Sequence, residues 1–219
     1  MIKIGKDISS FSTYSCQPTD KNELKKIIKS RIEKEGTNCN LNDIDTSLIT
    51  DMSYLFSGEI FDNFNGDISE WNVSNVKYMA WMFYCSVFNG DISKWNVSNV
   101  KDMSNMFADS SFNRDISNWD VRRVKRMNCM FAKSKFNQDI SRWNTKNVTI
   151  MSHMFNCSKF NKDISKWDVS NVKDMTRMFS MSKFKQDISN WNLREDCNTL
   201  QMFYGCKIRN EHKPKSLQK

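Results

Sequence analysis

Six aspartates recur at intervals of 24 residues, and such a row of carboxylates is a candidate for binding Ca²⁺. They are Asp67, Asp91, Asp115, Asp139, Asp163 and Asp187. Each one precedes an Ile-Ser pair, where an aspartate side chain accepts a backbone N–H two residues further on and forms an Asx-turn. The glycine-aspartate pattern of calcium-binding β-rolls is missing from the sequence. The spacing therefore favours turns over cation binding, and we expect no metal site.

The other reactive side chains do not form a catalytic pattern. The two histidines are His153 and His212, and no nucleophile motif, phosphate-binding loop or metal-ligand cluster accompanies them. The seven cysteines form no C-x-x-C pair and hold no constant place in the repeat, which is typical of free thiols in a reducing compartment. We therefore expect no enzymatic activity, no catalytic residues and no cofactor.

The aspartates belong to a repeat of 24 residues that runs through most of the chain. Its tryptophans are Trp71, Trp95, Trp119, Trp143, Trp167 and Trp191. Phenylalanines keep the same interval from Phe64 to Phe184, and Met-Phe pairs keep it from Met82-Phe83 to Met202-Phe203. The consensus unit is F-N-x-D-I-S-x-W-[ND]-V-S-N-V-K-x-M-x-x-M-F-x-x-S-x. A period kept this strictly predicts one supersecondary unit per repeat, with neighbouring units stacked to bury their apolar faces.

Two hydrophobic spacings within each unit predict two elements. Residues 92–97 follow the pattern apolar-x-x-apolar-x-apolar of a leucine-rich-repeat strand. Residues 100–107 place apolar side chains at i, i+3, i+6 and i+7, which is one face of a helix. Ser98 or Asn99 is placed to cap that helix. The sequence thus predicts an α/β repeat solenoid, a leucine-rich-repeat-like stack of 24-residue strand–helix units with an N-terminal capping helix.

Asparagines that follow the repeated phenylalanines predict a ladder between units. They are Asn65, Asn89, Asn113, Asn137 and Asn161. In a stack, each side chain would satisfy backbone groups that are buried between neighbouring units.

The predicted domain organisation has four parts. Residues 1–18 are an unassigned leader, and residues 19–36 form the capping helix, with Thr19 or Asp20 at its start and Gly36 after its end. Residues 37–206 form the solenoid of about seven coils, including a degenerate first coil before a three-residue insertion. Residues 207–219 are a polar, basic tail that we expect to be disordered beyond a last contact or two.

The repeated string F-N-x-D-I-S-x-W-[ND]-V-S-N-V-K-x-M-x-x-M-F resembles the BspA-like leucine-rich-repeat surface proteins. More narrowly, it is similar to the repeat domain of unknown function that is common on mycoplasma lipoproteins. The resemblance covers about residues 41–206 and implies a solenoid, frequently on cell surfaces, with adhesion or host binding proposed for some members. It implies no catalytic residues. The chain begins without an apolar stretch of signal-peptide length, so the sequence as written predicts a cytoplasmic protein, whereas the resemblance implies the cell surface.

Residues that vary between units are the candidates for binding, and in solenoids the strand face is the usual binding surface. The outward position before each tryptophan varies freely, and a basic corner follows it. The candidate partner-binding residues are Lys94, Asn118, Arg142 and Lys166 in the first row and Arg122, Lys146 and Arg194 at the corner. We expect them to bind a protein partner, with ordinary solvated surface as the alternative.

The charge pattern leaves two further functions open. The formal net charge is +8, but 25 acidic residues are scattered among 33 basic ones, so the excess is diffuse. The alternatives are a structural or spacer repeat protein without a specific ligand and a weak electrostatic binder of an anionic polymer. The aromatic residues hold periodic core positions instead of lying among the basic ones, so we expect no nucleic-acid binding. No apolar run reaches 18 residues, so we expect no membrane insertion, and we expect a monomer.

Overall fold

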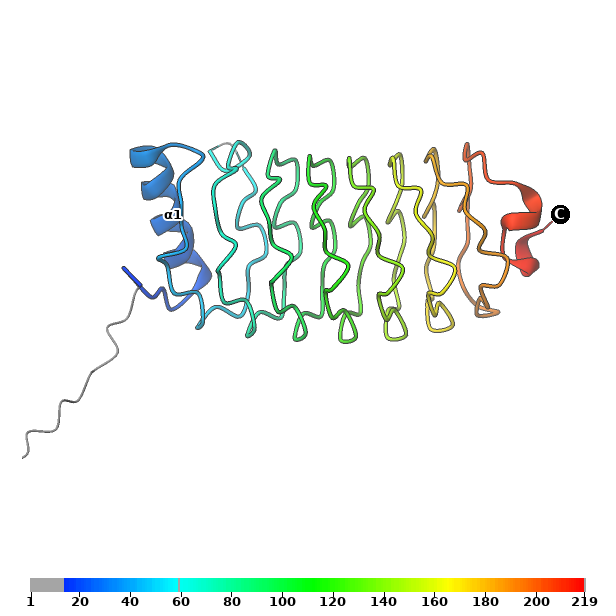
Figure 1. Cartoon of the computed structure of the whole chain (residues 1–219). Helices are drawn as coiled ribbons and strands as arrows, with labels where there is room; N and C mark the ends of the chain where they lie inside the picture. The colour runs from blue at the N-terminus through cyan, green and yellow to red at the C-terminus, as the bar shows by residue number, and fades with distance from the viewer. Residues whose placement is uncertain (1–13, 59, 219) are drawn as a thin grey trace, which may run out of the picture.

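The computed structural model describes residues 14–58 and 60–218. The chain forms an elongated stack in which each repeat unit makes one turn, here called a rung (Figure 1). Helix α1 (Lys21–Glu35) lies at one end. The 3-10 helices η1 (Asn210–His212) and η2 (Lys215–Leu217) lie at the other end. These three helices are the only regular elements of the described chain, and neighbouring rungs are joined by isolated parallel bridges.

The expected α/β solenoid of strand–helix units is wrong. Residues 92–97, expected as a strand, consist of turns and irregular chain, and residues 100–107, expected as a helix, contain one isolated bridge followed by turns. The bridges recur once per rung, as in Tyr78 to Asp102 and Asp102 to Arg126, and do not extend into named strands. Ser98 and Asn99 therefore cap no helix.

The distance between rungs explains why no helix forms in residues 100–107 and their equivalents in the other rungs, here called the Met-Phe segment. The rings of Phe83, Phe107 and Phe131 stack in one column, with centroids 5.6 Å and 5.9 Å apart. An α-helix with its side chains is about 10–12 Å across. Successive helices would not fit side by side at this spacing. The apolar pattern of residues 100–107 suits a tighter chain path as well as it suits a helix.

That path consists of consecutive turns. Met106 N–H donates to Met103 O at 3.2 Å, and Ala108 N–H donates to Asn105 O at 3.2 Å. Asn105 has φ 58°, and Asp109 has φ 55°. A positive φ at the third residue is the mark of a type II turn. The N–H groups that alternate with these point toward the next rung: those of Met103, Asn105 and Phe107 donate to its carbonyls at 2.9–3.0 Å.

The core consists of columns that run along the stack. The Met-Phe column continues as Phe56, Phe83, Phe107, Phe131, Phe155, Phe179 and Phe203. A second column contains Phe64, Phe88, Phe112, Phe136, Phe160 and Phe184, at 6.1–6.3 Å. Buried methionines and the repeated tryptophans fill the rest. Each tryptophan also donates its indole N–H to the previous rung, as Trp119 Nε1 does to Ile92 O at 3.1 Å.

The repeated polar residues take the structural roles that the sequence predicts. Every aspartate of the row accepts the backbone N–H of the serine two residues on, at 2.8–3.0 Å. The asparagine ladder is confirmed as well: Asn113 N–H donates to Asn89 Oδ1 at 2.9 Å, and Asn137 N–H donates to Asn113 Oδ1 at 2.8 Å. Both rows stabilise the corners of the stack and the pairing between rungs.

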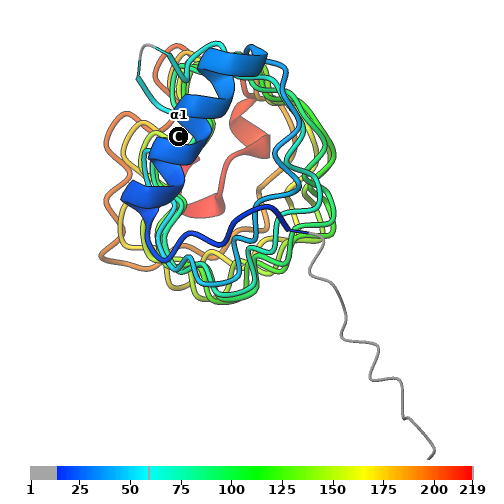
Figure 2. The same cartoon turned by 90° about the vertical axis from the view of Figure 1, so that its left-hand side faces the viewer.

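Helix α1 covers the first rung (Figure 2). Asp20 caps it by accepting the N–H groups of Asn22 and Glu23, and Gly36 follows its end with φ 87°, as the sequence predicts. Three apolar side chains on one face are buried: Leu24, Ile28 and Ile32. Of the leader, residues 1–13 lie outside the described residues, whereas Cys16 forms a parallel bridge with Ile44.

The basic tail is ordered, contrary to the expected disorder. Residues 206–218 turn back over the end of the stack through η1 and η2 (Figures 1 and 2). Ile208 and Pro214 are buried, and His212 O accepts the N–H of Ile188 at 2.9 Å. The tail covers apolar surface that no further rung is present to bury.

Candidate interaction surfaces

The first predicted binding row is exposed along one side of the stack. Lys94, Asn118, Arg142 and Lys166 each precede a buried tryptophan and lie in successive rungs. Lys94 Nζ lies 3.5 Å from Glu70 Oε1 in the preceding rung, and the side chains remain 74% and 62% exposed. An ion pair this exposed contributes little to stability. The structure brings the four residues into one row, although this row is not the face of a β-sheet.

The row of repeated aspartates next to the first predicted row offsets the positive charge of its lysines and arginine. The backbone N–H of Ser93 holds the pKa of Asp91 below its ordinary value, and the positive charges of Lys94 and Arg114 lower that pKa further. The pKa of Asp139 is lowered in the same way, mainly by the backbone N–H of Ser141 and further by the positive charge of Arg142. Because these carboxylates stay ionised beside the lysine and arginine, the first row is a mixed-charge surface.

The second predicted row lies at the corner between the tryptophan and Met-Phe segments. Arg122 and Lys146 are exposed, and Arg194 is half-buried. Arg122 Nη2 lies 2.7 Å from Asp120 Oδ2, and Arg194 Nε lies 2.7 Å from Asp196 Oδ1. Asp120 also accepts the backbone N–H of Arg122 at 3.1 Å in a second Asx-turn. Such turns recur at this corner, which explains why Asn or Asp follows every tryptophan.

The corner contains an arginine that the predicted set omitted. The asparagine of the consensus Ser-Asn-Val donates its side-chain amide one rung back, as Asn99 Nδ2 does to Ser74 O at 2.7 Å and Asn147 Nδ2 does to Arg122 O at 2.7 Å. Arg123 occupies this place in its rung, and its Nη1 donates to Asn99 Oδ1 instead. The departure from Ser-Asn-Val is the sequence signal that identifies this residue.

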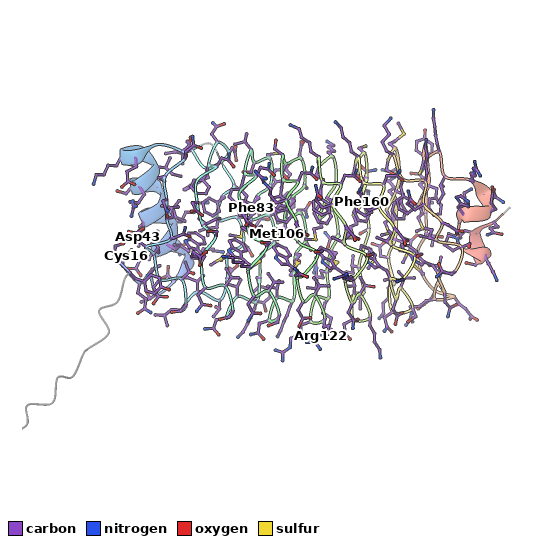
Figure 3. The ribbon with its side chains drawn as sticks, viewed as in Figure 1. Cys16, Asp43, Phe83, Met106, Arg122 and Phe160 are labelled. Carbon is purple, nitrogen blue, oxygen red and sulfur yellow. The ribbon has the colours of Figure 1, made fainter. Side chains whose placement is uncertain are left out.

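Hollows of about 390–610 Å³ lie along this surface, and one of them lies beside Arg123. This hollow, here called the corner hollow, measures about 610 Å³ and is lined by Ser98, Asn99, Asp120, Arg122, Arg123 and Asn147. Arg122 projects from the lower side of the stack (Figure 3). Two guanidinium groups in adjacent positions, each held by an oxygen acceptor, give this hollow its positive character.

Residues 23–135 and, again, residues 110–215 match the family described as "Mycoplasma protein of unknown function, DUF285". The chain belongs to this family. The two overlapping matches span the capping helix and nearly all rungs. Comparison with curated proteins and with solved structures gives no match. Membership in the family of unknown function does not name a ligand, so the chemistry of each surface must be judged from its residues.

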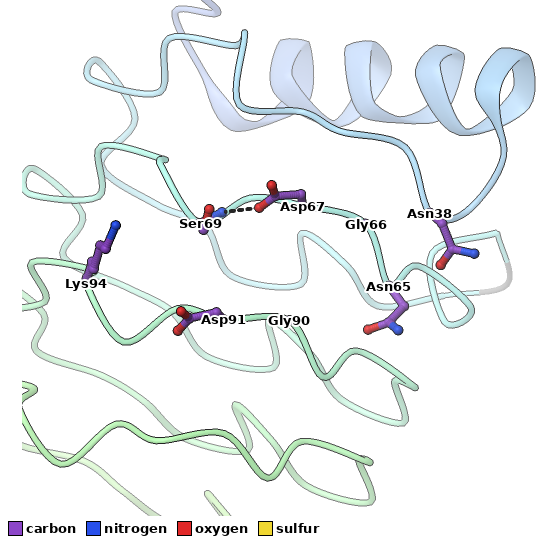
Figure 4. Close-up of a pocket in the computed structure, with 8 residues that line it drawn as sticks. All are labelled: Asn38, Asn65, Gly66, Asp67, Ser69, Gly90, Asp91 and Lys94. Carbon is purple, nitrogen blue, oxygen red and sulfur yellow. Dashed lines mark hydrogen bonds between the residues drawn. The ribbon is translucent and has the colours of Figure 1, made fainter.

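A second hollow of this family member lies near α1 (Figure 4). It measures about 430 Å³ and includes Asp67, Asp91 and the predicted Lys94. Gly66 and Gly90 line it at the place where later rungs carry residues such as Gln138, whose side chain donates to the previous rung. A Cβ at Gly66 would lie 2.0 Å from the carbonyl oxygen of Cys39, so close backbone packing accounts for this glycine.

The Met-Phe side presents variable residues at the left-handed positions. They include Trp81, Asn105, Cys129, His153, Arg177 and Gln201 in one row. Trp81, the tryptophan outside the periodic series, stacks on Tyr54 at 5.6 Å and meets Tyr84 edge-on at 4.7 Å. Its ring is half-buried by these two neighbours, so the cluster covers the junction between the first two rungs.

The described residues contain no group of three or more His, Cys, Asp or Glu side chains placed to hold a metal ion. Their seven cysteines are free thiols. Across residues 14–58 and 60–218, no helix has both the length and the apolar character needed to cross a membrane.

Proposed function

We propose that this protein is a non-catalytic protein-interaction module that binds an acidic segment of a partner protein at the corner hollow. The observation that supports the proposal is the pair Arg122 and Arg123 on one hollow of about 610 Å³. Guanidinium groups recognise carboxylates through paired N–H donors, and hydrogen bonds to charged groups are stronger than neutral ones.

Both arginines are positioned and still have donors for a ligand. Arg122 uses Nε and Nη2 for Asp120, and Arg123 uses Nη1 for Asn99. Their remaining N–H groups are available to a carboxylate. Arg126 and Lys125 follow in the same rung and are exposed, which extends the positive charge beyond the hollow.

The surroundings of the hollow favour a protein over a long anionic polymer. A polyanion gains affinity from each phosphate or sulfate that a basic residue neutralises. The neighbouring rungs carry the neutral asparagines Asn99 and Asn147 at the place of Arg123, although Lys146 adds one charge beside Asn147. The first predicted row alternates with ionised aspartates. A short acidic segment matches one charged hollow, whereas a long polymer would also meet the aspartates.

The other predicted residues extend the contact area in this proposal. Lys146 lies one rung beyond Arg122, and Asn118, Arg142, Lys166 and Lys94 border the same side. The sequence resemblance to BspA-like surface proteins, among which adhesion or host binding has been proposed, favours a protein partner outside the cell.

The test uses a labelled decapeptide of glutamate and leucine as the probe and Arg123→Asn as the variant. This change restores the consensus asparagine at this position, so the variant is expected to fold. We expect its affinity for the peptide to fall about tenfold or more, because a hydrogen bond to a charged group is worth about 1.5–3 kcal/mol.

The matched control is Arg114→Gln, which removes one positive charge from a residue that does not line the hollow and introduces the glutamine found at the equivalent position 138. We expect its affinity to stay within about twofold of the unmodified chain, because exposed charges separated by more than a Debye length are largely screened. Equal losses for the two variants would show that net charge, not the hollow, determines binding. Heparin bound equally by both variants would support the anionic-polymer alternative instead.

A further inference from the structure

The last rung has a row of unpaired backbone donors. In the preceding rung, Met175, Arg177, Phe179 and Met181 donate their N–H groups to carbonyls of the last rung at 2.7–3.0 Å. The equivalent residues of the last rung are Thr199, Gln201, Phe203 and Gly205. Their N–H groups have no acceptor among the described residues. The ladder of hydrogen bonds that joins the other rungs therefore ends in these four unpaired N–H groups, and residues 199–205 are here called the open edge.

The open edge offers backbone hydrogen-bond donors and few free acceptors. The carbonyls of Thr199, Gln201 and Phe203 already accept N–H groups within their own rung, each at 3.0 Å. Two copies of this edge would place donors against donors. A symmetric dimer through the open edge is therefore excluded by its hydrogen-bond pattern.

The opposite end of the stack is closed to the same kind of pairing. Lys25 of α1 donates its Nζ to the carbonyls of Tyr54 and Ser57, at 2.9 Å and 3.4 Å. Lys21 Nζ lies 2.7 Å from Asp51 Oδ2. Helix α1 thus lies along the Met-Phe segment of the first rung, and a second copy cannot stack head to tail.

The tail covers a different part of the end. Its hydrogen bonds from His212 go to residues 185–188, before the last repeated tryptophan: His212 O accepts the N–H of Ile188, and the His212 ring lies 3.3 Å from Lys185 O. On the Met-Phe side, Leu200 and Tyr204 remain 64% and 63% exposed. Phe203 is half-buried, unlike the fully buried phenylalanines that precede it in its column.

A hollow and an exposed apolar cluster lie next to the open edge. The hollow measures about 380 Å³ and is lined by His153, Asn156, Arg177, Ser180, Met181, Gln201 and Tyr204. Met181 is 56% exposed. The same end carries an excess of basic residues: Lys207 is exposed, and Lys213 Nζ lies 5.9 Å from the Phe203 ring. Arg209 is exposed as well and lies 3.9 Å from Glu211. The site combines backbone donors, apolar contact area and positive charge.

We infer that the open edge binds an extended acidic segment of a partner protein, which adds one further rung in trans. The segment runs parallel to residues 199–205 and presents a carbonyl at every second residue, as each rung does to the one before it. Apolar side chains spaced as Met-x-x-Met-Phe contact the half-buried Phe203 and the exposed Leu200 and Tyr204, and acidic side chains face the basic tail. This site is separate from the corner hollow and does not depend on the function proposed there.

The test uses a synthetic peptide with the sequence of residues 101–110, blocked at both ends, and the full chain. The peptide carries one lysine and two aspartates and already has the required apolar spacing. Amide hydrogen exchange is followed by NMR. In the free chain, we expect the amides of Thr199, Gln201, Phe203 and Gly205 to exchange much faster than those of Met175, Arg177, Phe179 and Met181. With peptide at about ten times its dissociation constant, exchange at the four edge amides should slow by about tenfold.

The pattern of amide protection decides the outcome. Protection of the four alternate amides supports the inference, and a peptide with aspartate in place of its two methionines and its phenylalanine should give no protection. Equal protection of all amides from 198 to 206, or none at saturating peptide, overturns it. Arg123→Asn should leave the edge protection unchanged, so failure at the corner and failure at the edge are distinguishable.

Discussion

The ring of Phe131 lies 5.9 Å from the ring of Phe107 in the preceding rung, with an angle of 7° between the ring planes. Phe155 lies 5.8 Å away on the other side, so the ring is covered on both faces. This contact, repeated along the stack, sets the rung spacing and excludes a helix from the Met-Phe segment.

Replacing Phe131 with alanine should strongly destabilise the stack. The change leaves a cavity between two rings, and such substitutions in a core cost about 3–5 kcal/mol. Urea unfolding measured by circular dichroism gives the free energy of unfolding. Phe203→Ala is the matched control, because Phe203 is half-buried and stacks on Phe179 alone. Equal costs for the two changes would contradict the role of two-sided stacking.

Substituting Lys133 with asparagine should stabilise the protein. Lys133 has φ 55° and an exposed side chain, and its N–H donates to Asn156 O at 2.7 Å. A left-handed conformation costs an ordinary residue about 1–2 kcal/mol, and asparagine tolerates it better. We expect a gain of up to about 1 kcal/mol in the free energy of unfolding.

Lys159→Asn is the control for this change. Lys159 is exposed and is not among the residues with positive φ, so the charge is lost without relief of backbone strain. A gain at Lys159 as large as at Lys133 would mean that charge, not φ, determines the effect.

The sequence predicts the polar architecture better than the fold class. An Asx-turn and an asparagine ladder depend on local spacing and on the period alone, so Asp91 and Asn113 could be assigned without knowing the chain path. The apolar spacing of Met103, Met106 and Phe107 does not distinguish a helix from consecutive turns. The deciding quantity is the distance between rungs, which depends on ring stacking between units.

The exposure of the candidate binding residues was predictable from the sequence, and the charge that surrounds them was less so. The predicted basic residues other than the half-buried Arg194 are exposed, as their variability suggested, but the sequence does not show that Asp91 lies beside Lys94 and offsets its charge. Arg123 is identifiable only once the asparagine that it replaces is known to bind the previous rung.

The side-chain oxygen of Asn113 should be required as a hydrogen-bond acceptor in the asparagine ladder. Its Oδ1 accepts the N–H of Asn137 at 2.8 Å, and alanine would leave that donor unpaired between rungs. An unsatisfied buried donor costs about 1–3 kcal/mol. Asn113→Asp keeps an oxygen acceptor and should lose much less stability at pH 7, as measured by urea unfolding. Equal losses for alanine and aspartate would show that packing, not the hydrogen bond, accounts for this position.

The aspartate row should make the stack sensitive to acid. Backbone N–H groups of Ser93, Ser141 and Ser189 hold the pKa values of Asp91, Asp139 and Asp187 below the ordinary range. A carboxyl whose pKa is lower in the folded chain stabilises that chain above the unfolded pKa of about 3.9, and this stabilisation is lost as the pH falls from that value through the lower pKa of the folded chain.

The triple variant with asparagine at these three positions tests the point. Asparagine keeps an oxygen for each serine N–H and does not titrate, so the variant should match the unmodified chain closely at pH 7. Between pH 5 and pH 3, its free energy of unfolding should fall less steeply than that of the unmodified chain, since three of the groups that bind protons on unfolding are gone. Urea unfolding at several pH values across this range measures both slopes. Parallel slopes would mean that other carboxylates, such as Asp51 beside Lys21, determine the acid sensitivity instead.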